Sequence, residues 1–471
     1  MRTTALITLI FLTNCGSNNN ETIVSQLITH YKNIQLPASY AIAFDATYFT
    51  KYQSYDYNDV NGTTFSYVTE IDDDNKYAYN RRISNRGGGF AFDYITVIVG
   101  SEAFEYSFNK LWSGNIIDSI NGEENYAFFK KDRINRLNSA RAKAFLDTPL
   151  DSLQYEFDSN KDEISIRKAS QKDTVQFIFS LQPMRLKKII EGNRTTIYKK
   201  FKPEGELSYA TEFDELIDNE LGSTHVITHF EALEKIDSEK LQLPEGYTFS
   251  KKENNDEAFS KIGDISYIIR DDRTRRNILF TKIDDQITVL GAPDSNELSE
   301  RVLSIIDNEF PNAKISHVYV THMHSDHIMG LEEYVIRGIT IVADQFTMEG
   351  IKDYEPFQQS IATFKFKKIE DRAILNGIQY HYPKNGHCKS QGFAYVIADQ
   401  IIYQGDFMQL SPKPNLIAST IIPEATSSFI ERIYQEDLAV NTIVGQHQIG
   451  SEIPMAFINQ YYQMHKGKNA K

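Results

Sequence analysis

Three histidines and one aspartate lie within six consecutive positions in the second half of the chain: His322, His324, Asp326 and His327. They follow the apolar, β-branched run Ile315–Val320, which predicts a strand. A turn at the end of that strand could aim several of these side chains at one point. Neutral imidazole and carboxylate are ligands that zinc favours. Because so dense a set is hard to explain as a solvated loop, this stretch predicts a metal site.

Three more residues of the same kinds each follow a later predicted strand: His387, Asp406 and His447. A glycine precedes each of them by one or two positions, which suits a tight turn and a close backbone approach. A single histidine after a strand is more often a hydrogen-bonded core or rim residue. In this order, after a His-x-His-x-Asp-His run, the three residues indicate a metal centre far more specifically.

This order of residues resembles that of the metallo-β-lactamase-fold metal-dependent hydrolases, over residues 256–471. The resemblance implies an αββα sandwich, in which two packed sheets with outer helices hold a dinuclear zinc site at their edge. It also implies two zinc ions per chain and a division of the ligands between them. The first metal would be held by His322, His324 and His387, the second by Asp326, His327 and His447, and Asp406 would bridge both.

Two departures from the family pattern limit what can be carried over. The segment Val289–Pro293 occupies the place of an early strand end, but the aspartate usual there is missing. That aspartate stiffens the histidine cluster, so its support must come from elsewhere. After His387 the chain continues Cys388, Lys389, Ser390, where many members have Thr-Pro-Gly. We interpret Cys388 as a small space-filling residue rather than a reactive thiol.

These residues predict a zinc-dependent hydrolase in which a hydroxide shared by two metals attacks an ester, thioester, lactone or phosphodiester-type bond of a small molecule. Asp406 as a bridging ligand favours the thiolesterase, lactonase and phosphodiesterase-like branch. Asp326 and Asp406 are the catalytic candidates, because both could orient the nucleophile and a protonated Asp326 could pass a proton to the leaving group. Substrate choice is expected in the loops Gln345–Lys367 and Ser411–Ser427, which contain no recognisable motif.

Other functions remain open. An iron-dependent oxidoreductase of the same fold would use the same kinds of ligand. A nuclease of this fold is disfavoured, since the formal net charge of −14 argues against a nucleic-acid partner. A non-catalytic surface binding protein with a structural metal site is the third alternative, although structural zinc sites are usually closed. The oligomeric state cannot be predicted.

The elements around the cluster predict an α/β fold in the C-terminal half. Strand patterns alternate with helical ones, as in layered folds whose sheets are covered by helices. Among them, we expect helices at Met348–Phe357 and Phe429–Leu438 and a strand at Ile361–Phe366.

The first half of the chain predicts a mostly antiparallel β-sheet domain over residues 22–250. The whole chain has 27 Tyr and 29 Phe, and in this half aromatic and β-branched residues alternate with polar ones between short polar turns. Helices are expected only at residues 22–40 and at Asp132–Asp147. The strand rhythm resembles the half-barrel of the lipoprotein-carrier and lipoprotein-sorting family, whose inner face could shelter an apolar ligand or, as we favour, dock on the second domain. The charged stretch Lys251–Asp264 is the expected boundary.

Residues 1–21 are interpreted as a lipoprotein signal and polar linker. Arg2 is followed by the apolar run Ala5–Leu12, which is too short to span a bilayer. The next residues, ending at Cys15, resemble a bacterial lipoprotein signal, although Asn14 departs from the small residue usual before that cysteine. We therefore expect a lipid anchor on Cys15 and a location in the cell envelope, at the periplasmic or outer membrane. A plain signal peptide or a wrongly assigned start is the alternative.

Overall fold

The computed structural model describes residues 22–111, 114–147, 153–158, 161–169, 174–202, 207–249, 259–271, 273–292, 294–408, 419, 421–447 and 452–466. The predicted lipoprotein signal lies outside these residues, as does most of the predicted domain boundary. Among the residues described, no helix is long and apolar enough to cross a membrane.

The first part of the chain forms a fourteen-stranded sheet, in the order β14-β6-β5-β4-β3-β2-β1-β13-β12-β11-β10-β9-β8-β7. Its strands are β1 (Tyr40–Tyr48), β2 (Thr63–Asp72), β3 (Tyr77–Arg86), β4 (Phe90–Val99), β5 (Glu102–Ser107), β6 (Ile116–Ser119), β7 (Leu153–Asp158), β8 (Glu163–Ala169), β9 (Thr174–Leu181), β10 (Met184–Glu191), β11 (Arg194–Lys202), β12 (Tyr209–Ile217), β13 (Glu220–Ala232) and β14 (Thr248–Phe249). All neighbours pair antiparallel except β14 and β6. The predicted antiparallel sheet is confirmed.

Helices cover one face of this sheet, which we call the N-terminal sheet. They span residues 22–33, α2 (Gly122–Ile134) and α3 (Asn138–Leu146). Alternate residues of β1, such as Ile42 and Phe44, pack under α2 and α3, as the two-residue period of a strand requires. The stretch Asp132–Asp147 is mostly helical, as predicted, but it contains the end of α2 and all of α3, and the predicted start was wrong. The side chain of Asn121 accepts a hydrogen bond from the amide of Glu124, so a capped helix begins well before the predicted start.

The second part of the chain forms two further sheets. The seven-stranded sheet contains, in order, β15 (Phe259–Lys261), β16 (Ser266–Asp271), β17 (Arg276–Ile283), β18 (Gln286–Leu290), β19 (Lys314–Tyr319), β20 (Thr340–Ala343) and β21 (Lys365–Lys368). The six-stranded sheet contains, in order, β22 (Ile374–Leu375), β23 (Ile378–His381), β24 (Phe393–Val396), β25 (Ile401–Gln404), β26 (Thr442–Gly445) and β27 (Ile453–Pro454). The helices are α4 (Asn296–Glu309), α5 (Ser325–Ile328), α6 (Leu331–Ile336), α7 (Gln345–Asp353), α8 (Glu424–Gln435) and α9 (Met455–His465).

These elements stack in four layers. Residues such as Leu279 and Tyr403 form an apolar core between the two sheets. The neighbours of Leu279 along β17 point the other way, toward α4, α6 and α7, so both faces of the seven-stranded sheet are buried. Helices α8 and α9 pack on the outer face of the six-stranded sheet. This is the αββα sandwich implied by the resemblance to the metallo-β-lactamase fold, and the prediction is confirmed.

Some predicted element boundaries in the sandwich were wrong. The stretch Ile361–Phe366 is not a single strand, because a turn of 3-10 helix, η6 (Ile361–Thr363), precedes the edge strand β21. Helix α7 begins three residues before the predicted Met348, since the carboxylate of Asp344 accepts hydrogen bonds from its first turn. Helix α8 begins before Phe429, at Glu424.

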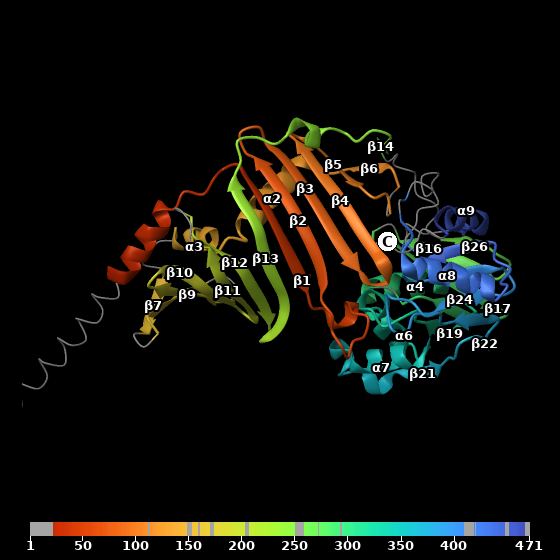
Figure 1. Ribbon diagram of the computed structural model, residues 1–471. Coiled ribbons are helices and arrows are strands. Elements are labelled where there is room, and N and C mark those ends of the chain that lie inside the picture. The colour runs from red at the N-terminus through yellow and green to blue at the C-terminus, as the bar shows by residue number, and fades with distance from the viewer. Residues whose placement is uncertain are drawn as a thin grey trace, which may run out of the picture.

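The N-terminal sheet reaches the sandwich through the connections between its strands (Figure 1). Between β1 and β2 lies the short helix η1 (Lys51–Gln53), where the hydroxyl of Tyr52 donates to Asp353 of α7 at 2.9 Å. Between β3 and β4 lies the turn η2 (Gly87–Gly89), which contacts α8. Asp56 forms an ion pair with Lys389 at 2.7 Å. These contacts bring two loops of the sheet to the sandwich edge that carries the histidines.

Candidate metal centre

The seven residues predicted as ligands lie together at one edge of the sandwich. The run from His322 to His327 begins three residues after the end of β19 and continues into α5, while Asp406 and His447 follow β25 and β26. His387 comes from the loop between β23 and β24. The side chains form two groups whose candidate ligand atoms lie within 4.8 Å of one another: His322, His324, His387 and Asp406, and Asp326, His327, Asp406 and His447.

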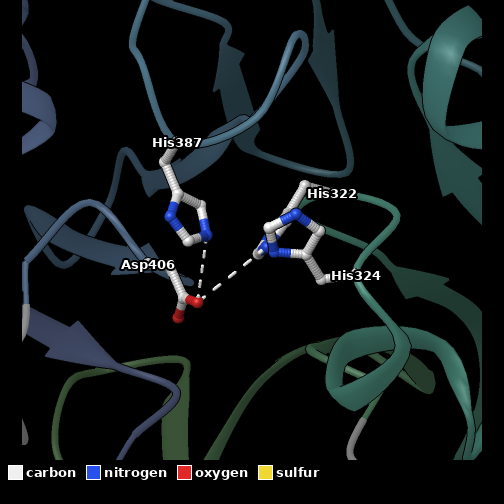
Figure 2. A group of neighbouring side chains, drawn as sticks. All are labelled: His322, His324, His387 and Asp406. Carbon is white, nitrogen blue, oxygen red and sulfur yellow. Dashed lines mark ion pairs between the residues drawn. The ribbon is translucent and has the colours of Figure 1, made fainter. Parts of the chain in front are cut away.

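Asp406 belongs to both groups, and its two oxygens face different histidines. Its Oδ2 lies 3.2 Å from Nε2 of His387 and 4.0 Å from Nε2 of His322, as the dashed lines in Figure 2 show. Its Oδ1 lies 2.8 Å from Nε2 of His447 and 3.3 Å from Nε2 of His327. The carboxylate therefore lies between the two sets of imidazoles.

Asp326 completes the second group. Its Oδ2 lies 3.6 Å from Nε2 of both His327 and His447. Two ligands at about 2.0–2.1 Å from a tetrahedral zinc lie roughly 3.3–3.5 Å apart. The spacing in this group therefore fits a metal ion.

The hydrogen bonds of the cluster also indicate metal binding. Five ring nitrogens of the cluster are buried and make no hydrogen bond of good geometry among the described residues: Nε2 of His322, His327, His387 and His447, and Nδ1 of His324. The first four lie within 4.0 Å of an oxygen of Asp406. Buried polar atoms are almost always hydrogen-bonded or bound to a metal, because leaving them unpaired is costly. All five belong to the two groups, so the donor set fits metal binding in both.

Burial sets the charge of two histidines in the first group. It lowers the pKa of His322 well below its usual value, and the neighbouring imidazoles add to the effect. It lowers the pKa of His324 to about 3, again with help from a nearby imidazole, that of His387. Both rings are therefore neutral, which is the form that binds a metal.

Charge pairing dominates the second group. Burial alone would raise the pKa of Asp326 and Asp406, but the imidazoles of His327 and His447 outweigh it and lower the pKa of both carboxyls. Burial opposes the charged form of His327, yet the two carboxylates raise its pKa. Both aspartates are therefore ionised and able to act as anionic ligands.

The sandwich itself orients two of the histidines. Nδ1 of His327 is 2.9 Å from Oε1 of Gln446, an oxygen that also accepts a hydrogen bond from the hydroxyl of Tyr403 at 3.2 Å. Gly291 has φ of 100°, and a Cβ there would lie 2.0 Å from the Tyr403 hydroxyl. The segment in which the resemblance led us to expect an aspartate thus leaves room for Tyr403 and Gln446 to support the cluster. His322 has its own partner, Oγ1 of Thr321 at 3.1 Å.

Side-chain amides fix the turns that carry Asp406 and His387. Oε1 of Gln404 accepts from the amides of Phe407 and Met408. With its amide oxygen turned toward the same turn, Gln391 accepts from the amide of Asp406 at 3.0 Å. In the other loop, Oδ1 of Asn385 accepts from the amide of His387 at 2.9 Å. Both ligands therefore stand on hydrogen-bonded turns rather than on free loops.

Several residues that the sequence did not predict surround Asp326, His324 and His387. Arg276 donates to Oδ2 of Asp326 at 3.3 Å. From the N-terminal sheet come Gln53, the carbonyl of Ser54 and the glycine turn η2. The run of three glycines was a readable signal of close backbone approach. Gln53 and Ser54 carry no such signal, because they lie some 270 positions from their partners.

Cys388 is fully buried, and burial raises the pKa of its thiol to about 12. This fits the interpretation as a space-filling residue. The stretch Gln345–Lys367, expected to be a loop over the site, instead contains α7, two short 3-10 helices and most of β21. Much of the other expected loop, Ser411–Ser427, lies outside the described residues, and its last residues form the start of α8.

Comparisons with known proteins give structural neighbours only. No family model matches the chain, and no curated protein matches it. The chain is similar to a solved metallo-β-lactamase from Hirschia baltica, at 14% identity and a TM-score of 0.35, over 44% of this chain and 96% of that one. It is also similar to one from Pontibacter korlensis, at 16% identity and a TM-score of 0.36, over 44% and 98%. The fold assignment rests on the four layers described above.

Proposed function

We propose that this protein is a hydrolase that uses two zinc ions to cleave an ester, thioester, lactone or phosphodiester-type bond of a small molecule. The observation that carries the proposal is the position of Asp406, whose two oxygens face two separate sets of buried imidazoles. A structural zinc site needs only one closed set of four ligands. Two adjacent sets that share a carboxylate are the arrangement expected of a two-metal hydrolytic centre.

When bound, two zinc ions would supply a hydroxide nucleophile at neutral pH and Lewis acidity toward the electrophilic oxygen of the substrate. The three imidazoles of the first group would hold one ion as neutral ligands: His322, His324 and His387. The second group would hold the other through Asp326, His327 and His447, with Asp406 shared between both.

Asp326 is the residue best placed to move a proton. Its Oδ1 accepts a hydrogen bond from Gln53 at 2.8 Å, and its Oδ2 accepts one from Arg276 at 3.3 Å. Both donors favour the ionised carboxylate, so Asp326 would be a weak base that carries a proton only in passing from the nucleophile. The protonated carboxyl could then pass that proton to the leaving group. Asp406 would hold the nucleophile between the two groups without leaving its position.

The proposal is tested with the full chain loaded with zinc and screened against lactones, thioesters, phosphodiesters and sulfate esters. We expect hydrolysis of at least one class, and loss of that activity in His324→Ala while circular dichroism shows a folded protein. His317→Ala is the matched control, because His317 lies half-buried on β19 but belongs to neither ligand group. Equal turnover by His324→Ala and wild type would contradict the proposal.

Metal analysis separates the alternatives. An iron-dependent oxidoreductase would purify with stoichiometric iron and would be inert in every hydrolase assay. A binding protein with a structural site would retain zinc tightly and also be inert. Either result would overturn the proposed hydrolysis.

We also propose, from the sequence alone, that the protein is attached to a membrane of the cell envelope through a lipid on Cys15. Metabolic labelling with a radioactive fatty acid tests this. Label that is present in wild type and absent in Cys15→Ala is the expected result, whereas an unlabelled wild-type protein would contradict it.

A further inference from the structure

We propose that the N-terminal sheet completes the metal centre. Its loops contact three predicted ligands of the sandwich at their outer atoms, meaning the side-chain atoms that face away from the centre. The residues involved are Gln53, Ser54 and Gly87, and the ligands are Asp326, His324 and His387. The inference rests on the metal centre of the proposed function. It assigns the N-terminal sheet a role in metal binding itself, beyond that of a covering or anchoring domain.

Gln53 orients Asp326. Its Nε2 donates to Oδ1 of Asp326 at 2.8 Å and lies 3.2 Å from Oγ of Ser325, at the start of the same short helix. The other oxygen of Asp326 faces His327 and His447. Gln53 therefore binds the carboxylate oxygen turned away from these imidazoles. The other oxygen faces the two histidines, where it can act as a ligand, and also accepts a hydrogen bond from Arg276.

The carbonyl of Ser54 selects the tautomer of His324. It lies 3.0 Å from Nε2 of that ring and can only accept a hydrogen bond, so Nε2 must carry the proton. Nδ1, which has no partner among the described residues, is then the unprotonated nitrogen that faces the centre. Ser54 is held in turn, because its hydroxyl donates to the carbonyl of Thr50 at 2.9 Å.

The glycine turn η2 lies against the segment of His387. The carbonyl of Gly87 is 3.4 Å from Nδ1 of His387, and Phe90 packs edge-on against the same ring. A Cβ on Gly88 would lie 3.0 Å from Cβ of His387 and 2.8 Å from Cβ of Ala425. The absence of side chains in η2 is what allows the turn to approach so closely.

The sandwich offers no substitute for these three contacts in the part of the chain that the structure describes. It supplies outer partners to His322 and His327, through Thr321 and Gln446. Among the residues described, the outer nitrogens of His324 and His387, and Oδ1 of Asp326, are bonded only from the N-terminal sheet. Support of the centre is therefore divided between the two parts of the molecule.

The outer partner of a metal ligand fixes the ligand's orientation and raises its basicity, and losing one typically weakens metal binding about 10–100-fold. Gln53 is thus a positioning residue, since it acts through Asp326. Its test is zinc affinity, measured by competition with a chromophoric chelator on the full chain. This readout does not depend on the substrate.

Gln53→Met keeps the length of the side chain and removes the donor. We expect the zinc ion of the group that contains Asp326 to bind about 10–100-fold less tightly. Lys51→Met is the matched control, because Lys51 lies on the same η1 and loses an exposed ion pair with Asp353 but contacts no ligand. Its zinc affinity should equal that of wild type. Equal affinities of Gln53→Met and Lys51→Met would overturn the role of Gln53.

A pair of glycine variants tests the turn. Gly88→Ala and Gly100→Ala both place a side chain at positive φ, at 77° and 63°, at opposite ends of β4. Only Gly88 faces His387, whereas a Cβ on Gly100 meets nothing within 4 Å. We expect zinc affinity to fall in Gly88→Ala and to stay unchanged in Gly100→Ala. The inference fails if wild type binds zinc and both Gln53→Met and Gly88→Ala bind it as tightly as wild type does. If wild type binds no zinc, the proposed function fails first.

Discussion

At the scale of single residues, the candidate centre depends on Asp406 more than on any histidine. Each imidazole lies in one group, whereas the carboxylate lies in both and is almost fully buried. Its ionised form is kept by the imidazoles around it, which lower its pKa despite burial. An amide at this position would keep the shape but lose the negative charge that two cations share.

Asp406→Asn should therefore weaken binding of both zinc ions. We expect a loss of more than about 100-fold in affinity, because losing a mere outer partner already costs about 10–100-fold. Competition with a chelator measures this. Asp307→Asn, at an exposed carboxylate on α4 outside both groups, is the control and should bind zinc like wild type. Unchanged affinity in Asp406→Asn would mean that Asp406 does not bridge.

Cys388 makes a contrasting prediction, because it adjoins a predicted ligand but faces the core. With burial raising the pKa of the thiol to about 12, the charged thiolate is negligible at pH 8. We expect the folded protein to react with a thiol reagent at Cys388 far more slowly than the unfolded protein does. Cys388→Ala should retain zinc affinity. Rapid labelling of Cys388 in the folded protein would show that the site is open to thiol chemistry.

At the scale of elements, the turn after β18 shows how the fold adapts to a missing carboxylate. Gly291 at φ of 100° opens the space filled by the hydroxyl of Tyr403, which bonds the same amide oxygen of Gln446 that holds His327. The sequence pattern predicts this support at the end of one strand. In the structure, Tyr403 and Gln446 of two other strand ends supply it.

Gly291→Ala should destabilise the protein by about 2–4 kcal/mol, from backbone strain together with the clash against Tyr403. Gly338→Ala has a similarly positive φ of 72° but a Cβ there would meet only the end of Lys365, at 3.6 Å. It should cost roughly 1 kcal/mol, from the left-handed backbone alone. Urea unfolding of both variants measures the difference, and equal free energies of unfolding would contradict the proposed packing.

Strand ends were the most predictable part of the molecule. The sequence predicted all seven ligands at the ends of strands or in the turns after them. The structure brings the seven side chains together. Helix starts were less predictable. Asn121 and Asp344 cap α2 and α7 and so determine where these helices begin. A cap is a single polar residue, and the sequence contains many similar residues that could serve equally well.

At the scale of the whole molecule, the outer contacts to Asp326 and His324 could not be predicted. Gln53 and Ser54 lie in an unremarkable polar stretch, and only the docking of the N-terminal sheet brings them to ligands some 270 positions away. The hydrogen bonds that complete the site are thus a property of tertiary structure. Ligand types and spacing identify the centre, but they do not identify what surrounds it.

Removing metal should destabilise the whole protein. A ligand that binds only the folded state adds about 2.7 kcal/mol at 100 times its Kd and about 4.1 kcal/mol at 1,000 times. We expect the melting temperature to fall on chelation and to recover when zinc is added back. Asp406→Asn should show a much smaller shift between the two conditions. A melting temperature that does not respond to chelation in wild type would mean that the centre holds no metal.

The most direct test of the account is the number of zinc ions per chain in the full-length protein, measured by mass spectrometry of the metals after loading and desalting. The account predicts two zinc ions per chain for wild type and fewer than two for Asp406→Asn, because one buried carboxylate serves both groups. A wild-type protein that retains a single zinc ion, or none, would contradict it.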